Sequence, residues 1–287
     1  MTARAAEAPG PTFAVAFGGG GARGLAHIHV IAALDELGIR PTAIAGSSIG
    51  AMMGAAMAAG MRGSDIEDHA RAVLSNRGEA MTRLWRSRPR SVGALAAGGI
   101  RLGQFDVERI LRAFLPEPFP RRFEDMAIPF EVTATDFYGH GEHVFTEGDL
   151  FTALAASAAL PALFRPVCHE GRLFIDGGIT NPVPFDLLDG KADIVVGVDV
   201  VGGPVEDARV RPSSLGLLMG AGQIMMGAIV ELKLRQRPPH ILLRPPVAHF
   251  GALDFLKARR VLDETRPVRE ALKREIDRAT ERHLRRP

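Results

Sequence analysis

Short apolar runs alternate with helical stretches through the first part of the chain. Phe13–Phe17 and residues 42–46 are uncharged and only five residues long, which predicts two buried strands. Residues 25–37 between them have the pattern of a helix that ends at Gly38. A strand, a helix and a second strand in this order form a βαβ unit, so the sequence predicts a parallel sheet.

The same alternation continues to the end of the chain. We expect helices over residues 49–59, 105–115 and 149–159, and one or two amphipathic helices within 253–284. Further strands are expected over residues 129–136, 142–145, 171–176, 193–201 and 241–243. Residues 1–12 lack the apolar run of a signal peptide and are expected to form a flexible tail. Residues 13–287 are then left for a single domain.

The turn after the second predicted strand holds a serine between two glycines. Gly46, Ser48 and Gly50 form the pattern G-x-S-x-G, which places a serine hydroxyl on a strained strand-to-helix turn. Glycine is needed at both flanking positions, because a Cβ there would collide with the neighbouring backbone. The pattern predicts that Ser48 is a nucleophile, and a plain tight turn is the alternative.

A second glycine-rich turn follows the first predicted strand. Gly19, Gly21 and Gly24 have the G-x-G-x-x-G spacing of dinucleotide-binding loops, but the next strand does not end in the acidic residue that would hold a ribose. Bare glycines at the start of a helix can instead point backbone N–H groups at a developing negative charge. We favour such an oxyanion hole, completed by the N–H of Ile49. A turn that needs glycine only for its shape is the remaining alternative.

A serine nucleophile needs a base within hydrogen-bond distance. None of the nine histidines lies in a recognisable motif, and the serine comes earlier in the chain than in α/β-hydrolases. Asp176 is the better candidate, because it ends an apolar strand and the following Gly177 and Gly178 leave room for another loop. In a parallel sheet, Asp176 and Ser48 would meet at the edge where the strands end. Partial burial would raise the pKa of this carboxylate, whereas the alternative role is to cap the next turn.

Composition narrows the choice of partners. The net charge of +2 gives no bulk electrostatic basis for nucleic-acid binding. The single cysteine, Cys168, excludes an internal disulfide and fits a reducing compartment. Residues 71–101 carry seven arginines around Trp85 against one acid, which makes them a candidate lid or membrane contact, with a solvated excursion as the alternative. Residues 213–230 are uncharged and close to the ~20 residues that span a bilayer, but we favour a buried or interface helix.

Three motifs in this order resemble the patatin-like phospholipases: GGGGARG at 18–24, GSSIG at 46–50 and DGG at 176–178. The segment from 123 to 200 strengthens the resemblance, which is close over residues 13–200 and looser beyond. The resemblance implies that Ser48 is the nucleophile and Asp176 the general base of a dyad without histidine. It further implies that the oxyanion hole is lined by Gly19, Gly20 and Gly21, and that Arg23 helps to fix their loop.

We therefore expect an α/β fold, a three-layer α/β/α sandwich with a mostly parallel central sheet. The expected activity is serine acyl hydrolysis of a lipid ester, of phospholipid or lysophospholipid type, without metal or cofactor. The expected location is the cytoplasm, with peripheral contact to the inner membrane surface. The alternatives are a catalytically silent scaffold or regulator of the same fold, and a nucleotide-binding protein that uses the glycine loop.

Overall fold

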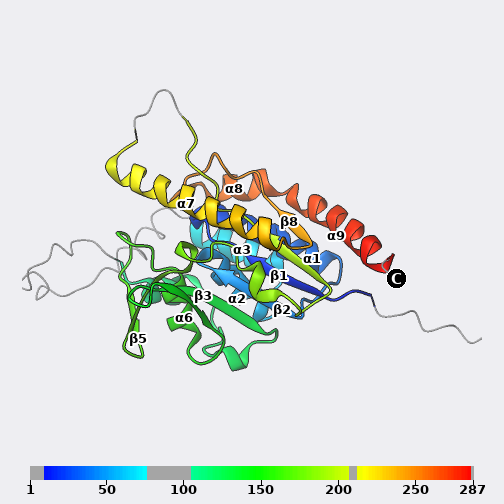
Figure 1. Ribbon diagram of the computed structural model, residues 1–287, viewed down its shortest axis with the longest axis horizontal. Helices are drawn as coiled ribbons and strands as arrows, with labels where there is room; N and C mark the ends of the chain where they lie inside the picture. The colour runs from blue at the N-terminus through cyan, green and yellow to red at the C-terminus, as the bar shows by residue number, and fades with distance from the viewer. Residues whose placement is uncertain (1–9, 76–104, 207–211, 286–287) are drawn as a thin grey trace, which may run out of the picture.

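A central sheet of eight strands organises the protein (Figure 1). The computed structural model describes residues 10–75, 105–206 and 212–285. Within them the strand order is β5-β6-β3-β2-β1-β7-β8, and β4 pairs with β3. The strands are β1 (Phe13–Phe17), β2 (Ala43–Ser47), β3 (Phe130–Asp136), β4 (Gly141–Phe145), β5 (Val167–His169), β6 (Arg172–Asp176), β7 (Ile194–Val198) and β8 (Ile241–Leu243).

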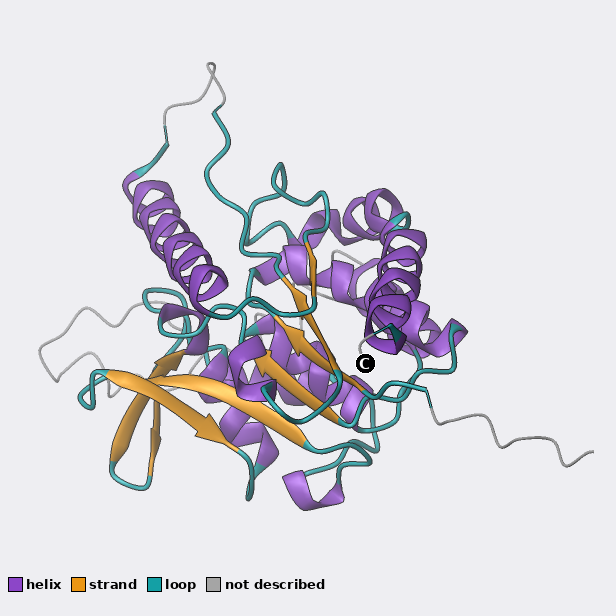
Figure 2. Ribbon diagram, turned by 45° about the vertical axis from the view of Figure 1, so that its right-hand side comes forward, coloured by secondary structure: helices purple, strands orange, loops and turns teal. Residues whose placement is uncertain are grey.

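Helices connect these strands and cover both faces of the sheet (Figure 2). They are α1 (His27–Glu36), α2 (Ile49–Ala58), α3 (Gly63–Ser75), α5 (Val107–Phe114), α6 (Leu150–Ser157), α7 (Ser214–Gln236), α8 (Ala258–Thr265) and α9 (Val268–Leu284). The predicted α/β fold is confirmed, and all predicted helices and strands within the described residues are present. The short strand β5 was not predicted, because its three residues carry no apolar pattern.

The sheet is parallel in its main part and antiparallel at one side. Strands β3, β2, β1, β7 and β8 run in the same direction. Strand β4 returns antiparallel along β3, and β6 is also antiparallel to β3. The expectation that Asp176 ends a parallel strand is therefore wrong, since β6 runs against its neighbour.

Alternation along β1 divides the core into two parts. Phe13, Val15 and Phe17 face the larger core with α1, α2, α6 and α9, whereas Ala14 and Ala16 face a thinner layer. The thin layer is formed by the 3-10 helix η5 (Phe185–Leu188) and by one side of α7. Small alanines on this face let η5 approach the strands closely, which completes the three-layer arrangement.

The structure describes only parts of the expected tail and of the arginine-rich stretch. Thr12, expected in the flexible tail, is hydrogen-bonded to Asp193. The backbone N–H of Thr12 donates to Oδ2 of Asp193 at 2.8 Å, and the hydroxyl of Thr12 donates to the same oxygen at 2.7 Å. The arginine-rich stretch begins in α3, and its part from residue 76 to 101, including Trp85, lies outside the described residues. Its role as a lid stays a prediction.

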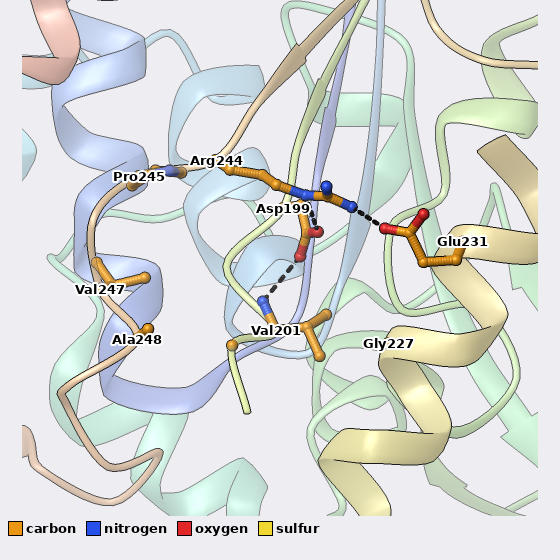
Figure 3. Close-up of a pocket in the computed structure, with 9 residues that line it drawn as sticks. Asp199, Val201, Gly227, Glu231, Arg244, Pro245, Val247 and Ala248 are labelled. Carbon is orange, nitrogen blue, oxygen red and sulfur yellow. Dashed lines mark hydrogen bonds and ion pairs between the residues drawn. The ribbon is translucent and has the colours of Figure 1, made fainter. Parts of the chain in front are cut away.

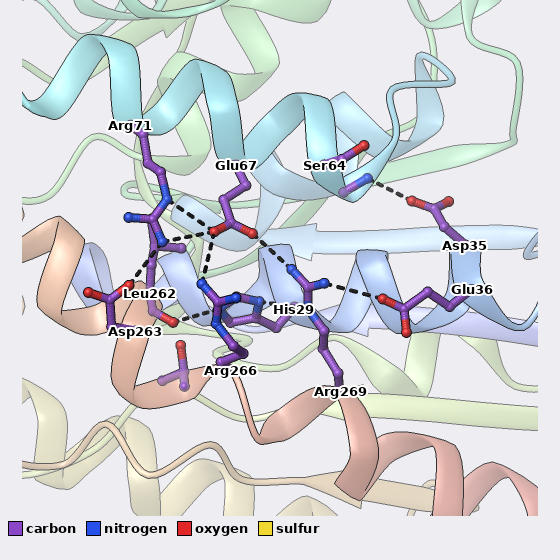
Figure 4. Close-up of polar contacts among 12 residues, drawn as sticks. His29, Asp35, Glu36, Ser64, Glu67, Arg71, Leu262, Asp263, Arg266 and Arg269 are labelled. Carbon is purple, nitrogen blue, oxygen red and sulfur yellow. Dashed lines mark hydrogen bonds and ion pairs between the residues drawn. The ribbon is translucent and has the colours of Figure 1, made fainter.

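A half-buried polar cluster joins the helices on the thick side (Figure 4). Glu67 of α3 accepts from Arg71 at 2.9 Å and from Arg269 of α9 at 2.8 Å. Arg269 also donates to Nδ1 of His29 at 3.1 Å, so Nε2–H of His29 donates to the Leu262 carbonyl at 2.7 Å. Burial lowers the pKa of His29, and the ring links α1 to α8 as a neutral group.

Candidate active site

Ser48 occupies a strained turn between β2 and α2. Its backbone angles are φ 53° and ψ −125°, in a region that side chains with a Cβ rarely adopt. Such a conformation costs about 1–3 kcal/mol and is kept where surrounding contacts enforce it. Helix α2 begins at the next residue, so the positive end of the helix lies beside the serine.

Two glycines make this turn possible. A Cβ on Gly46 would lie 2.5 Å from the Cα of Ala51, and a Cβ on Gly50 would collide with the carbonyl oxygen of Phe17. The turn is thus pressed between its own helix and the end of β1. The predicted need for glycine at both positions is met by these contacts.

Ser48 and Asp176 meet because β2 and β6 end against each other. Residues 132–136 of β3 pair with β4 along one edge. On the opposite edge, Ser47 of β2 lies beside Thr133 and Asp176 of β6 lies beside Ala134. Since β6 is antiparallel, its carboxyl end points at the carboxyl end of β2. The two side chains therefore meet by head-on approach of two strands, and not at the shared edge of a parallel sheet.

The carboxylate of Asp176 binds both the serine and its own turn. Oγ of Ser48 donates to Oδ2 at 2.7 Å, and the N–H of Gly178 donates to Oδ1 at 2.8 Å. Asp176 is only 4% exposed. Burial raises its pKa to about 6, and the hydrogen bonds from Ser48 and Gly178 oppose that rise. Base and cap, which the sequence left as alternatives, are both compatible with this geometry.

Three polar side chains that the sequence analysis missed support the pair. Ser157 in α6 is fully buried, and its Oγ accepts from the backbone N–H of Ser48 at 2.8 Å. Thr135 donates to the carbonyl of Asp176 at 2.9 Å and also contacts Thr180 at 2.9 Å. Ser157 had a readable signal, because it falls on the apolar stripe of its helix, seven residues after Leu150.

The glycine loop lies directly against the serine. A Cβ on Gly19 would sit 3.3 Å from the Cβ of Ser48. The N–H of Gly19, however, donates to the carbonyl of Pro182 at 2.9 Å, so Gly19 is a close-approach residue and not an available donor. Gly20 precedes the 3-10 helix η1 (Gly21–Ala26), and among the described residues no acceptor is found for its N–H.

Two further N–H groups remain available near the serine. Gly21 and Ile49 are the first residues of η1 and α2, where N–H groups have no acceptor within the helix. Neither donates to another acceptor in the part of the chain that the structure describes. Of the four residues expected to line an oxyanion hole, Gly20, Gly21 and Ile49 keep free donors.

Arg23 and His27 are buried side chains whose hydrogen bonds fix the glycine loop. Arg23 is 1% exposed and its guanidinium donates to the carbonyl of Val201. Burial lowers the pKa of Arg23, whereas the charges of Asp199 and Asp254 raise it. Burial also lowers the pKa of His27 to about 4, so its ring is neutral and Nε2–H donates to the Gly18 carbonyl at 2.8 Å. His27 therefore fixes the loop instead of activating a serine.

Val201, whose carbonyl accepts from Arg23, lines a pocket of about 330 Å³ (Figure 3). Asp199 accepts from the N–H of Val201 and from Nε of Arg244, both at 3.0 Å. Arg244 reaches across to Glu231 of α7 at 2.5 Å. These contacts brace residues 199–201 behind the glycine loop, since the carbonyl of Val200 lies against Gly20. Arg244, the one guanidinium among the described residues that line the pocket, is already paired with two carboxylates.

No other residue type competes for the role of base. The hydrogen-bond partners of Ser48 and Asp176 among the described residues include no histidine. The same residues contain no group of three or more His, Cys, Asp or Glu side chains that could hold a metal ion. The arrangement can transfer a proton from a serine hydroxyl to a carboxylate, beside free backbone donors.

Comparison with known proteins supports the same class. Residues 15–189 match the family model described as patatin-like phospholipase. The chain is 36% identical over 203 residues to an uncharacterized NTE family protein of Mycobacterium tuberculosis, covering 69% of this chain and 52% of that protein. The protein belongs to the patatin-like phospholipase family.

Other similarities are more distant. Patatin-like phospholipase domain-containing protein 6 of Homo sapiens is 27% identical over 279 residues, covering 88% of this chain and 20% of that protein. The chain thus spans about half, or less, of the relatives named here. The crystal structure of VipD from Legionella pneumophila superposes with a TM-score of 0.47 at 16% identity, covering 92% of this chain and 67% of that chain. The family assignment depends on the family model and the mycobacterial relative.

Proposed function

We propose that the protein is a serine hydrolase that cleaves lipid acyl esters through Ser48 and Asp176. The observation that carries the proposal is the 2.7 Å hydrogen bond from Oγ of Ser48 to Oδ2 of Asp176, at a strained turn beside free N–H groups. This distance lies within the range that proton transfer requires. Membership of the patatin-like phospholipase family supports a lipid ester as the substrate.

In the acylation step, Oγ of Ser48 attacks the acyl carbonyl carbon while its proton moves to Oδ2 of Asp176. The carbonyl oxygen becomes an oxyanion, which the N–H groups of Gly20, Gly21 and Ile49 are placed to stabilise. When the tetrahedral intermediate collapses, the bond to the leaving alkoxide breaks and Asp176 returns the proton to that oxygen. The products are an alcohol and an acyl ester on Ser48.

In the deacylation step, Asp176 takes a proton from water, whose oxygen attacks the acyl carbonyl. Collapse of the second intermediate breaks the bond to Oγ, and the proton held by Asp176 restores the serine hydroxyl. A pKa of about 6 suits both directions of transfer, because the carboxylate is mostly ionised at pH 7 and is yet a stronger base than an exposed aspartate.

The finer assignments are part of the proposal. We infer a phospholipid or lysophospholipid as the acyl donor, because relatives bear the name patatin-like phospholipase. Peripheral contact with a membrane in the cytoplasm would bring this substrate to the enzyme. The exposed, unpaired Cys168 is compatible with such a reducing compartment.

The decisive experiment compares three variants on p-nitrophenyl butyrate and on lysophosphatidylcholine. Ser48→Ala and Asp176→Asn should each lose at least about a thousandfold in kcat/KM, as for nucleophile and base in other serine hydrolases. Ser47→Ala is the matched control, because the buried Oγ of Ser47 has no hydrogen-bond partner among the described residues. Wild type and Ser47→Ala should also be labelled by a fluorophosphonate. Activity or labelling retained by Ser48→Ala would refute the proposal.

A further inference from the structure

Helix α7 exposes a continuous apolar face that packing does not explain. Of the described helices, α7 is long and apolar enough to cross a membrane, yet only 6% of its most apolar stretch is buried. Its exposed residues are about 57–62% accessible and share one side of the helix: Leu217, Leu218, Ile224, Met225 and Leu232. This face runs about 22 Å at 1.5 Å per residue. This exposure contradicts the expectation of a buried helix and is compatible with the other expected role, that of an interface helix.

The opposite side of α7 is bound to the protein, so the helix cannot leave it easily. Val230 is 1% exposed and packs in the thin layer with Met226 and Leu234. Lys233 donates to Asp186 and to Asn181. A membrane-crossing position would expose these groups to lipid and break their contacts, so the helix is suited to lie on a bilayer and not to span it.

The bound side of α7 contacts the turn that holds Asp176. The methyl group of Met226 lies against Gly178, within 2.7 Å of the position that a Cβ there would take. Gly178 in turn donates to Asp176. Ile179, the next residue in the 3-10 helix η4 (Gly177–Ile179), is a second exposed apolar side chain in this region, at 38% exposure.

The charge pattern matches an anionic lipid surface. Residues 213–230 contain no charged side chain. Two charged residues lie near the end of this side: Glu231, which is paired with Arg244, and Arg235, which lies five helical turns after Leu217. Arg235 is exposed, and no ion-pair partner for it exists among the described residues. An arginine at the end of an apolar stripe can pair with phosphate groups while the stripe enters the bilayer interface.

We infer that the exposed face of α7 docks the protein onto a bilayer that contains anionic lipid, with Arg235 at the headgroup level. The inference rests on the proposed function in one respect: docking would supply the lipid esters that Ser48 is proposed to cleave. The physical basis is burial of apolar side chains in the interface together with one unpaired cation.

The test uses the full-length protein and sedimentation with vesicles of phosphatidylcholine alone or with 30% phosphatidylglycerol. All binding measurements use the Ser48→Ala background, so that they do not depend on hydrolysis. Leu217→Ser combined with Ile224→Ser should weaken the partition into vesicles by about tenfold, because two buried side chains of the stripe become polar. Arg235→Gln should remove the preference for anionic vesicles. The controls are Leu284→Ser and Arg282→Gln, exposed positions of α9.

In the active protein, the double variant should keep the wild-type rate on p-nitrophenyl butyrate and lose rate on vesicle phospholipid. Equal vesicle binding by the double variant and its background would overturn the inference. So would a dimer in light scattering that the double variant converts to a monomer, since a second copy would then be the occupant. A protein that docks as expected but hydrolyses neither substrate would refute the proposed function while leaving the docking surface intact.

Discussion

Oδ2 of Asp176 lies 2.7 Å from Oγ of Ser48, while Oδ1 of the same carboxylate is held by the N–H of Gly178. This division leaves one oxygen to exchange a proton with the serine and uses the other to fix the orientation of the group. Because burial raises the pKa of Asp176 to about 6, the ionised form that accepts a proton is the minor form at pH 5 and the major form at pH 7.

The first prediction concerns the pH profile of the reaction. The kcat/KM for p-nitrophenyl butyrate should rise with pH, reach half its maximum near pH 6 and level off above about pH 7, because the free enzyme must have Asp176 ionised. The rate should be measured between pH 4.5 and 8.5, with stability monitored in parallel. A half-maximum below pH 5 would indicate that an unperturbed carboxylate controls the rate.

The second prediction concerns stability and the same carboxylate. A folded-state pKa raised from 3.8 to about 6 means that the folded protein binds more protons than the unfolded chain between these values. The contribution of Asp176 to the free energy of unfolding is then fully present below about pH 4 and is lost as pH rises through 6. The loss amounts to at most about 3 kcal/mol. Asp176→Asn should therefore raise the free energy of unfolding by about 1–3 kcal/mol at pH 7.5.

Urea unfolding at pH 7.5 and pH 4 tests this sign. At pH 4 the gain of Asp176→Asn should be absent, because Asp176 is already neutral in the folded protein. Asp68→Asn, at an exposed position of α3, should change stability by less than about 0.5 kcal/mol at either pH. A variant that is less stable than wild type at pH 7.5 would show that hydrogen bonds to the charged form outweigh its burial.

The third prediction concerns the backbone at Ser48. Ser48→Gly and Ser48→Ala both remove the hydroxyl and its bond to Asp176, so they differ only in the Cβ at φ 53°. Ser48→Gly should be more stable than Ser48→Ala by about 1 kcal/mol, since release of strain exceeds the entropy that glycine loses on folding. Thermal and urea unfolding of the two variants give this difference directly. Equal stabilities would mean that the turn holds no strain.

The fourth prediction concerns the glycine loop. A Cβ on Gly20 would collide with the carbonyl of Val200, so Gly20→Ala should displace the N–H groups that are proposed to bind the oxyanion. Loss of such donors lowers kcat by about a hundredfold to a thousandfold, with a smaller effect on KM. Gly203→Ala is the control, because a Cβ there meets nothing within 4 Å. Full activity of Gly20→Ala would remove this loop from the mechanism.

The fifth prediction concerns the cluster between α3, α8 and α9. Burial opposes ionisation of Glu67, but Arg71 and Arg269 hold its pKa below the ordinary value. Its contribution is therefore present above the ordinary pKa of 4.5 and is lost as pH falls below that value. Glu67→Gln should reduce the free energy of unfolding by about 1–3 kcal/mol at pH 7, because two half-buried guanidinium groups lose the negative charge that they share. Glu281→Gln, at an exposed position of α9, should have no measurable effect.

The sequence predicted the elements and the contact between Ser48 and Asp176 better than the arrangement of the strands. Phe13–Phe17 and Ile194–Val198 are found because buried parallel strands are continuous apolar runs. The sequence could not predict that β6 is antiparallel to β3, because the alternation of side chains in RLFID is the same for either direction of the strand. Direction depends on the connection through β5, whose three residues give no signal.

The supporting residues were harder to predict than the reacting ones. The backbone N–H of Gly19 is used by Pro182, a residue 163 positions away in the chain, so its loss as a donor is a tertiary effect. Thr135 looks like any strand threonine, and only the position of Asp176 gives it a function. Helix α7 has the composition of a buried helix, but only the side that carries Val230 packs on the protein, which the composition does not reveal.

The end-to-end meeting of β2 and β6 makes the proposed catalysis depend on strand alignment. Successive side chains of a strand point to opposite faces, so a slip of β6 by one residue would set Ile175 in place of Asp176 and turn the carboxylate away. The hairpin that β5 forms with β6, through Phe174 beside Val167, prevents this slip. An insertion of a single residue between Arg172 and Asp176 should therefore silence the enzyme while leaving every motif intact in the sequence.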